Sequence, residues 1–178
     1  MYAPSDDTFL LADCIRQYNG RRALEIGVGS GLLLDILEKN FTYVAGSDID
    51  LQALQHCKQN KMMTSSENVL LVCCDAGSAF GIEKFDLIVS NPPYLPNDEG
   101  NILDPTVHGG PTGIEATVHF INSALPLLAG DGKLLIVISS VANSSALDKV
   151  VLENNMHKKV VKEKRLFYET LSIVELSL

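Results

Sequence analysis

The residues best suited to chemistry are Asn91-Pro92-Pro93-Tyr94, which directly follow an apolar run that ends at Ser90. The Asn91 side chain and the Pro92 carbonyl supply oxygen acceptors that can hold the N–H bonds of a planar nitrogen and favour tetrahedral geometry there. The prolines fix φ and lack N–H donors, so the acceptors are pre-organised, and Tyr94 can stack on a flat group. This turn predicts chemistry at an amide or exocyclic amino nitrogen, although Asn-Pro-Pro also suits a rigid loop without chemistry.

A glycine-rich turn, Glu25-Ile26-Gly27-Val28-Gly29-Ser30-Gly31, lies between a predicted strand and a predicted helix. Its glycines let the backbone approach a ligand without Cβ clashes, which predicts a nucleotide-like ligand at the end of the strand. A plain glycine-rich loop is the alternative, because such a motif alone is weak evidence. A dinucleotide site is disfavoured, since its fingerprint requires a helix-packing glycine where Leu32-Leu33-Leu34 stands here.

Aspartates end the next two predicted strands. From the end of the second strand, Asp48 can accept hydrogen bonds from both hydroxyls of a ribose, whereas Asp50 is better placed to cap the following helix. Asp75 closes the third strand, where its carboxylate can accept an adenine amino group while the Ala76 amide donates to a ring nitrogen. An N-cap role for Asp75 is the alternative.

Helical periodicity alternates with short apolar runs along most of the chain, which predicts an α/β sheet. Continuous apolar runs such as residues 134–138 favour parallel strands covered by helices on both faces. Near the end, polar and apolar residues alternate with no room for a crossover helix, which predicts an antiparallel hairpin. We expect one domain over residues 1–178 with seven strands, at residues 23–26, 43–47, 69–73, 85–90, 133–139, 158–164 and 170–176.

The helices are expected between these strands. Asp6 or Asp7 can cap a first helix that Asn19-Gly20 ends, and Gly130-Asp131-Gly132 is expected to form a turn before the fifth strand. The remaining helices are expected at residues 32–39, 50–60, 113–128 and 145–154.

Composition narrows the function further. The 178 residues carry a net charge of -8, which disfavours a protein that binds mainly to nucleic-acid phosphates. Cys14, Cys57, Cys73 and Cys74 lack zinc-ligand spacing, so we expect buried free thiols and no metal site. The N-terminus resembles no targeting segment and no apolar run is long enough for a membrane span, which favours a reduced, cytoplasmic setting.

Together these motifs resemble the Rossmann-like class I methyltransferases, and more closely the HemK-type protein-glutamine methyltransferases, which modify the Gly-Gly-Gln loop of peptide release factors. The opening Tyr2-Ala3-Pro4-Ser5-Asp6-Asp7-Thr8-Phe9-Leu10-Leu11 resembles the eukaryotic and archaeal branch, and Gly109-Gly110-Pro111-Thr112-Gly113 and Glu169-Thr170-Leu171-Ser172 match further signatures. The resemblance implies S-adenosyl-L-methionine as cofactor, S-adenosyl-L-homocysteine as product, and Asn91, Pro92 and Tyr94 as catalytic residues. The cofactor contacts that it implies are Thr8, Glu25, Gly27, Gly29, Asp48, Ile49, Asp75, Ala76 and Asn91.

The resemblance also implies partners. The substrate would be a release factor, and enzymes of this branch commonly work with a small zinc-binding activator of the Trm112 type that adds to the edge of the third strand. Residues 69–74 can form such an edge, and an apolar edge strand benefits from being covered. A strand shielded only by its own helices is the alternative.

Several alternatives remain at this point. A DNA or RNA methyltransferase acting on an exocyclic amine meets nearly the same hydrogen-bonding problem, but the sequence lacks a basic face, and the intact motifs disfavour a silent binding module. His108 and His119 are interpreted as solvated or capping residues, and the basic cluster at residues 158–165 as the solvent face of the hairpin. No catalytic base is assigned, because a neutral leaving group requires in-line approach more than a base. Residues 95–108 contain acidic residues but no Arg or Lys, and leave substrate recognition open.

Overall fold

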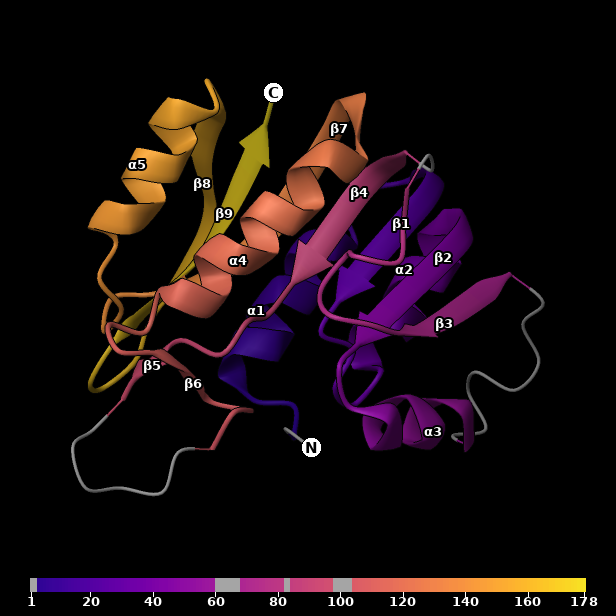
Figure 1. Cartoon of the computed structure of the whole chain (residues 1–178), viewed down its shortest axis with the longest axis horizontal. Coiled ribbons are helices and arrows are strands. Elements are labelled where there is room, and N and C mark those ends of the chain that lie inside the picture. The colour runs from indigo at the N-terminus through magenta and orange to yellow at the C-terminus, as the bar shows by residue number, and fades with distance from the viewer. Residues whose placement is uncertain (1–2, 60–67, 82–83, 98–103) are drawn as a thin grey trace.

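The computed structural model describes residues 3–59, 68–81, 84–97 and 104–178. One seven-stranded sheet has the order β3-β2-β1-β4-β7-β9-β8 (Figure 1). Neighbouring strands from β3 to β7 are parallel, whereas β9 is antiparallel to both β7 and β8. This confirms the predicted mainly parallel sheet with a C-terminal hairpin. The strands are β1 (Gly20–Ile26), β2 (Phe41–Asp48), β3 (Val69–Cys73), β4 (Phe85–Ser90), β7 (Leu128–Ser139), β8 (His157–Arg165) and β9 (Thr170–Ser177).

Helices cover both faces of this sheet: in Figure 1, α4 lies in front of the sheet, and α1 and α2 lie behind it. One apolar core lies between the sheet and α1, α2 and α3, and a second lies between the sheet and α4 and α5. Leu135 and Val137 of β7 face the first core, and Leu134 and Ile136 face the second. All four are at most 1% exposed, as expected for a strand buried on both faces. The helices are α1 (Asp6–Ile15), α2 (Leu32–Asn40), α3 (Leu51–Gln59), α4 (Glu115–Ala124) and α5 (Ser145–Glu153).

The path of the chain determines where a site can form. From β1 the chain moves outward to β2 and β3, and it then returns to β4 on the other side of β1. The loops that leave the carboxyl ends of β1 and β4 therefore diverge, and a crevice opens between them. The glycine-rich turn and the Asn91-Pro92-Pro93-Tyr94 turn both lie at this crevice.

The predicted ends of the first helix are wrong. Ser5 occupies the N-cap position, so neither Asp6 nor Asp7 does, and both lie inside α1. The helix ends at Ile15, before Asn19 is reached, and Gly20 pairs with Phe41 as the first residue of β1. Sheet pairing has overridden the local preference of Asn19-Gly20 for a helix stop.

Two later boundaries also differ from expectation. Gly130-Asp131-Gly132 forms no separate turn, because β7 begins at Leu128 and continues through it, with a register shift opposite β4. The helix predicted at residues 113–128 is α4 followed by a 3-10 turn, Leu125–Leu127. Pro126 lies in that turn and cannot donate the backbone hydrogen bond that a continuing α-helix requires. Asp50 does cap α3 as expected, since its Oδ1 accepts from the Gln52 amide at 2.8 Å.

Among the described residues, no helix combines the length and the apolarity that crossing a bilayer requires.

Candidate active site

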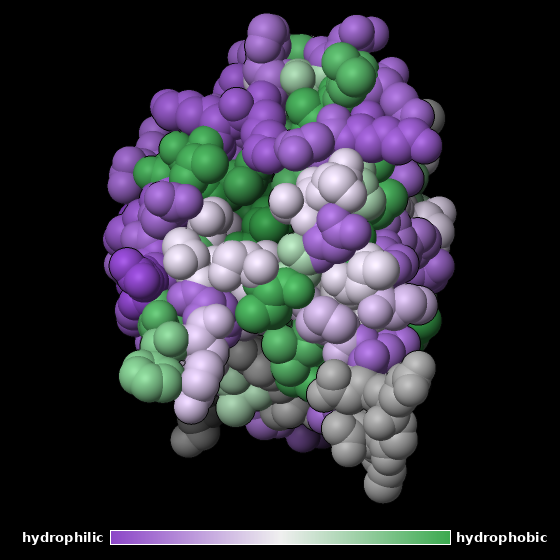
Figure 2. Space-filling model, turned by 90° about the vertical axis from the view of Figure 1, so that its left-hand side faces the viewer, coloured by the Kyte–Doolittle hydropathy of each residue, from purple (hydrophilic) through white to green (hydrophobic). Residues whose placement is uncertain are grey.

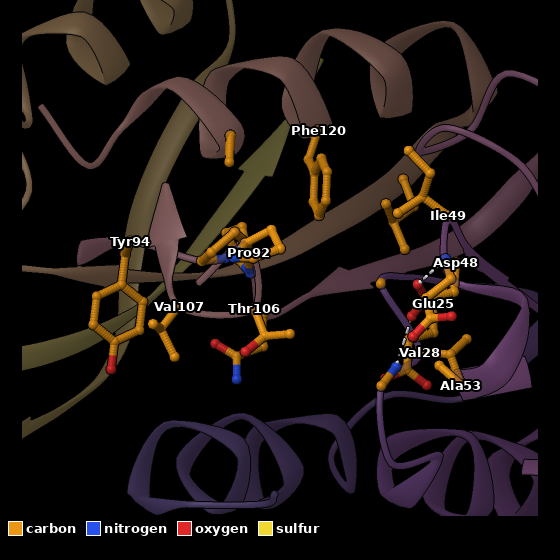
Figure 3. Close-up of a pocket in the computed structure, with 18 of the residues that line it drawn as sticks. Glu25, Val28, Asp48, Ile49, Ala53, Pro92, Tyr94, Thr106, Val107 and Phe120 are labelled. Carbon is orange, nitrogen blue, oxygen red and sulfur yellow. Dashed lines mark hydrogen bonds between the residues drawn. The ribbon is translucent and has the colours of Figure 1, made fainter. Parts of the chain in front are cut away.

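A cavity of about 660 Å³ occupies the crevice at the carboxyl ends of the parallel strands. Figure 3 shows Glu25 and Asp48 together at one end and Tyr94 at the other, with Pro92 and Phe120 between them. The fold thus brings together residues from four strand ends and from α1. Every residue predicted for the site lines this cavity, namely Thr8, Glu25, Gly27, Gly29, Asp48, Ile49, Asp75, Ala76, Asn91, Pro92 and Tyr94.

The glycine-rich turn follows β1 with left-handed backbone at Gly27, Gly29 and Gly31, whose φ values are +79°, +49° and +81°. Side chains rarely adopt this conformation, so glycine is required for the turn. A Cβ at Gly29 would meet no atom of the described residues within 4 Å, which leaves the backbone there open to a ligand in the cavity. The turn therefore provides the close approach that its sequence predicts.

Asp48 is fixed between the turn and its own strand end. Its Oδ2 accepts from the Gly29 amide and its Oδ1 from the Asp50 amide, both at 2.9 Å (Figure 3). Each carboxylate oxygen has a further lone pair, so Asp48 can still accept two hydroxyl donors. From the end of β2, Asp48 thus presents acceptors to the cavity, and its contact with a ribose stays a prediction.

Glu25 is the last residue but one of β1 and is 2% exposed. Its Oε2 has no hydrogen-bond partner among the described residues. Desolvation raises the pKa of this carboxyl well above its usual 4.5, and the nearby Asp48 carboxylate raises it further. A buried acid without a partner is unfavourable unless something in the cavity compensates it. A ligand that carries positive charge would do so.

A second buried oxygen of the cavity belongs to Asn91, the first residue after β4. Its Nδ2 donates to Thr8 Oγ1 at 3.3 Å, and Thr8 Oγ1 in turn donates to Asp7 Oδ1 at 3.1 Å. The Asn91 Oδ1 is buried and has no partner among the described residues. Since the N–H side of the amide is turned toward α1, its oxygen is left for a donor from the cavity.

Asp7 holds the other end of the same turn, because the Tyr94 hydroxyl donates to Asp7 Oδ2 at 3.3 Å. Asp7 is 2% exposed and lines the cavity, although its sequence context indicated only a helix cap. No local pattern could have revealed this role, because 87 positions separate the two residues. The first turn of α1 therefore braces both Asn91 and Tyr94.

The turn also packs against a glycine-rich loop that carries the Gly109-Gly110-Pro111-Thr112-Gly113 signature. Two short strands that the periodicity did not predict, β5 (Leu95–Pro96) and β6 (His108–Gly110), pair in parallel here. A Cβ at Gly109 would lie 2.3 Å from the Pro93 oxygen, and one at Gly113 would lie 2.3 Å from the Tyr94 oxygen. These glycines are thus required by the close approach of two backbones.

Asp75 follows β3 and lines the cavity, but no helix begins there, so the N-cap alternative does not apply. Its Oδ1 lies 2.7 Å from His119 Nε2, which leaves Oδ2 for a ligand. His119 was interpreted as solvated or capping; its side chain is 52% exposed, and it also pairs with this carboxylate. His108 lines the cavity, with its Nδ1 accepting from the Asp104 amide at 3.1 Å.

Other residues of the cavity were missed, because nothing in their local sequence indicates that their side chains reach it. Phe120 reaches the cavity from α4, where its neighbour His119 gave no sign of a site (Figure 3). Thr106 and Val107 come from the segment before β6, and Glu169 comes from the turn before β9. Glu169 belongs to a signature that the resemblance singled out, and this was the only signal that could have found it.

Comparison with known proteins places the chain in a family. The sequence profile of the methyltransferase small domain matches residues 5–169. A Methanocaldococcus jannaschii protein, provisionally named a protein N5-glutamine methyltransferase, is 31% identical over 79% of this chain and 73% of its own length. The release factor glutamine methyltransferase of Rhodopirellula baltica is 30% identical over 82% of this chain. The ribosomal protein uL3 glutamine methyltransferase of Xanthomonas campestris is 31% identical over 64% of this chain. This chain spans only 55% and 40% of the latter two proteins.

Solved structures share the fold. The structure of the E. cuniculi Mtq2-Trm112 complex, described as responsible for methylation of the eRF1 translation termination factor, matches with a TM-score of 0.76 at 23% identity, over 99% of this chain and 97% of that chain. The N-methyltransferase NodS of Bradyrhizobium japonicum in complex with S-adenosyl-L-homocysteine matches with a TM-score of 0.66 at 17% identity, over 96% of this chain and 85% of that chain.

The cofactor of such enzymes, S-adenosyl-L-methionine, fits the groups in this cavity. Its sulfonium and ammonium charges match the buried Glu25, whose Oε2 has no partner in the part of the chain that the structure describes. Its ribose hydroxyls and adenine amine are donors for which Asp48 and Asp75 retain free lone pairs. With its site and its profile match in agreement, the chain belongs to the methyltransferase small domain family of S-adenosyl-L-methionine-dependent methyltransferases.

Proposed function

We propose that this protein transfers a methyl group to the side-chain amide nitrogen of a glutamine, and that this glutamine belongs to the Gly-Gly-Gln motif of a peptide chain release factor. The observation that carries the proposal is the buried Asn91 Oδ1, which has no partner among the described residues, in a cavity that the next residue, Pro92, also lines. A primary amide offers two N–H donors, and these two oxygens can accept both of them.

The cofactor occupies the end of the cavity that holds Glu25 and Asp48. Asp48 accepts from the ribose, Asp75 Oδ2 and the Ala76 amide bind the adenine, and Glu25 compensates the positive charge. Gly27, Gly29, Ile49 and Thr8 complete the contact surface. When bound, the cofactor supplies an electrophilic methyl group on a positively charged sulfur.

The substrate amide occupies the end that holds Asn91, Pro92 and Tyr94. Hydrogen bonds to the two oxygens reduce the delocalisation of the nitrogen lone pair and direct it at the methyl group. The N–C bond forms as the S–C bond breaks, S-adenosyl-L-homocysteine leaves as a neutral thioether, and the nitrogen then releases one proton to water. Thr8 and Asp7 maintain the orientation of the Asn91 side-chain amide throughout the reaction.

Charge favours a protein substrate over DNA or RNA. The chain has a net charge of -8, and three of the five Lys and Arg residues of the basic strand β8 pair with acidic residues of other elements. Lys158 pairs with Asp148 at 2.6 Å, Lys162 with Asp13 at 3.0 Å and Lys164 with Asp6 at 2.9 Å. Nucleic-acid binding depends on cations that are free to replace counterions, so exocyclic-amine methylation of DNA or RNA is the weaker alternative.

We further propose that a small zinc-binding activator of the Trm112 type binds the outer edge of β3. Among the described residues β3 pairs only with β2, and Leu70 and Tyr43 on these strands are 57% and 48% exposed. A second hollow of about 560 Å³ lies beside them and is lined partly by Phe80 and Phe85. A partner that adds a strand would satisfy the edge and cover this apolar surface. For the compartment we propose the cytoplasm, since all four cysteines are free and thiols persist in reducing surroundings. The expectation that all four are buried is wrong, because Cys73 at the end of the edge strand β3 is exposed and Cys74 is partly exposed.

The test is methylation of purified release factor with isotopically labelled cofactor, with and without a co-expressed activator. We expect one label on the motif glutamine by mass spectrometry, and none on a release factor whose glutamine is replaced by glutamate. Label on ribosomal protein uL3 alone would redirect the proposal to another protein amide. Absence of label from every protein, combined with methylation of an oligonucleotide, would contradict it.

A further inference from the structure

The turn between β8 and β9 exposes two adjacent aromatic side chains. Phe167 and Tyr168 are 90% and 88% exposed, more than any other large hydrophobic side chain of the described residues. Their rings contact only at an edge, with centroids 4.6 Å apart and planes at 83°. Burying such a ring removes a large apolar area from water, so two of them side by side are suited to contact with another molecule.

The turn that carries them is rigidly attached. The Leu166 backbone amide donates to the Glu169 backbone carbonyl at 2.8 Å across the turn. The Leu166 side chain packs against the core. Glu169 accepts from the Ser139 hydroxyl, and Ser140 exchanges hydrogen bonds with Thr170 at 2.9 and 3.0 Å. Because the backbone is already fixed, binding at Phe167 and Tyr168 would order little more than their side chains.

This turn is continuous with the catalytic cavity. Glu169, directly after Tyr168, lines the cavity together with Asp7 and Asn91. In Figure 1 the β8–β9 turn lies on the same side of the molecule as β5 and β6. Figure 2 views the molecule from that side, where green hydrophobic residues are set among purple hydrophilic residues and white residues of intermediate hydropathy. A macromolecule that inserts a loop into the cavity would therefore meet the turn with its own surface.

We propose that Phe167 and Tyr168 form a docking contact for the body of the protein substrate, outside the cavity that receives the glutamine. The proposal rests on the proposed function, because only a folded protein that presents its amide on a loop would reach both places. An apolar surface of that protein covers the two rings, and the contact contributes to affinity for the protein without contributing to methyl transfer. Contacts of this kind commonly account for much of the binding at an interface.

A single-stranded nucleic acid is the occupant that the observations disfavour. Stacking of bases on aromatic rings is accompanied by free cations along the backbone path. Here Lys162 and Lys164, on the strand that leads to the turn, are engaged by Asp13 and Asp6 of α1. The two rings also stand edge to face, and this blocks part of one ring face against stacking.

The test compares intact protein substrate with a short peptide that carries the same Gly-Gly-Gln motif. We expect Phe167→Ala with Tyr168→Ala to raise KM for the intact protein by about tenfold or more, with kcat unchanged. Cofactor binding by calorimetry and kcat/KM for the peptide should remain at wild-type values. Phe167→Tyr with Tyr168→Phe retains both rings and should retain the wild-type KM. Leu152→Ala, which truncates a side chain that is 78% exposed on α5, is the matched control and should change nothing.

An unchanged KM for the intact protein would overturn the proposal, and so would an equal loss on protein and peptide, which would indicate distortion of the cavity. A double variant that methylates the protein normally but loses affinity for a single-stranded RNA oligonucleotide would assign the rings to nucleic acid instead. These outcomes are distinct from failure of the proposed function, in which the wild-type enzyme itself would leave the protein unlabelled.

Discussion

Replacing Asn91 by alanine should separate activity from stability. The side chain is placed in the cavity with its Oδ1 buried and without a partner among the described residues. A group in this state destabilises the folded protein but is ready to bind a substrate N–H. Asn91→Ala should therefore abolish most of the methyl transfer while leaving the protein at least as stable as the wild type.

The magnitudes follow from the contacts of this one side chain. A buried polar atom without a partner costs about 1–3 kcal/mol, and its removal returns that amount. The variant also loses the hydrogen bond from Nδ2 to Thr8 Oγ1, which at 3.3 Å contributes about 1 kcal/mol or less. The free energy of unfolding should thus be unchanged or slightly higher. Loss of one pre-organised hydrogen-bonding group at a reacting centre lowers kcat by roughly 10²–10³-fold.

The neighbouring Ser90 provides the matched control. It is fully buried at the end of β4, and its Oγ donates to the Ile26 oxygen at 2.8 Å. Ser90→Ala removes a hydrogen bond that is satisfied within the protein, so it should lower the free energy of unfolding by about 1 kcal/mol and Tm by about 2–4 °C. Its kcat should stay within a few-fold of wild type. Asn91→Ala is therefore expected to lose activity but not stability, whereas Ser90→Ala is expected to lose stability but not activity.

The assay is single-turnover methyl transfer at saturating cofactor, combined with thermal unfolding followed by fluorescence. Saturating cofactor removes any difference in cofactor affinity from the measured rate. If Asn91→Ala retains a rate near that of wild type, the assigned role of its oxygen is wrong. If the Tm of Asn91→Ala lies well below the Tm of Ser90→Ala, the interpretation of the buried oxygen as a destabilising group is wrong.

Three further predictions concern the groups around Asn91. Glu25→Gln should be more stable than wild type at alkaline pH. The raised pKa of Glu25 makes the stability of the wild type fall as pH rises from about 4.5 through the pKa in the folded state. Melting at a series of pH values should show that the difference vanishes in acid, and calorimetry should show weaker cofactor binding by the variant. Thr8→Val removes the acceptor of the Asn91 Nδ2 and should lower kcat by about tenfold in the same single-turnover assay, and an unaltered kcat would show that the amide needs no support from α1. Gly109→Ala would place a Cβ 2.3 Å from the Pro93 oxygen and so displace the catalytic turn, with a loss in kcat on the order of 10²-fold; Gly130→Ala, whose Cβ would meet nothing within 4 Å, is its control, and equal kcat for the two would contradict this account.

Much of the fold could be predicted from local patterns. The boundaries expected for β3 and β4, residues 69–73 and 85–90, are those that the structure shows, because short apolar runs bounded by polar residues leave little freedom in register. The boundaries that failed are those where tertiary pairing competes with a local signal. Gly20 and Gly130-Asp131-Gly132 have the composition of turns, yet β1 and β7 extend through them.

The site could be predicted in the same way, as far as its groups follow strands. In a parallel sheet all carboxyl ends meet at one edge, so Glu25, Asp48, Asp75 and Asn91 had to converge once each was assigned to a strand end. The glycines of the first turn and the prolines of the last also act through their own backbone angles. These properties depend only on neighbouring residues, so the sequence alone contains them.

Only the tertiary structure decided how those groups are oriented and what surrounds them. The brace from Asp7 and Thr8 to the catalytic turn spans more than 80 positions, Gly109 lies under Pro93 because two loops meet, and His119 of α4 pairs with Asp75. Glu169, which follows Phe167 and Tyr168, reaches the cavity from the start of β9, a strand that returns along β7. The periodicity of a sequence specifies which face of an element is buried. It does not specify which side chains from distant elements will touch, because that depends on how the elements pack in three dimensions.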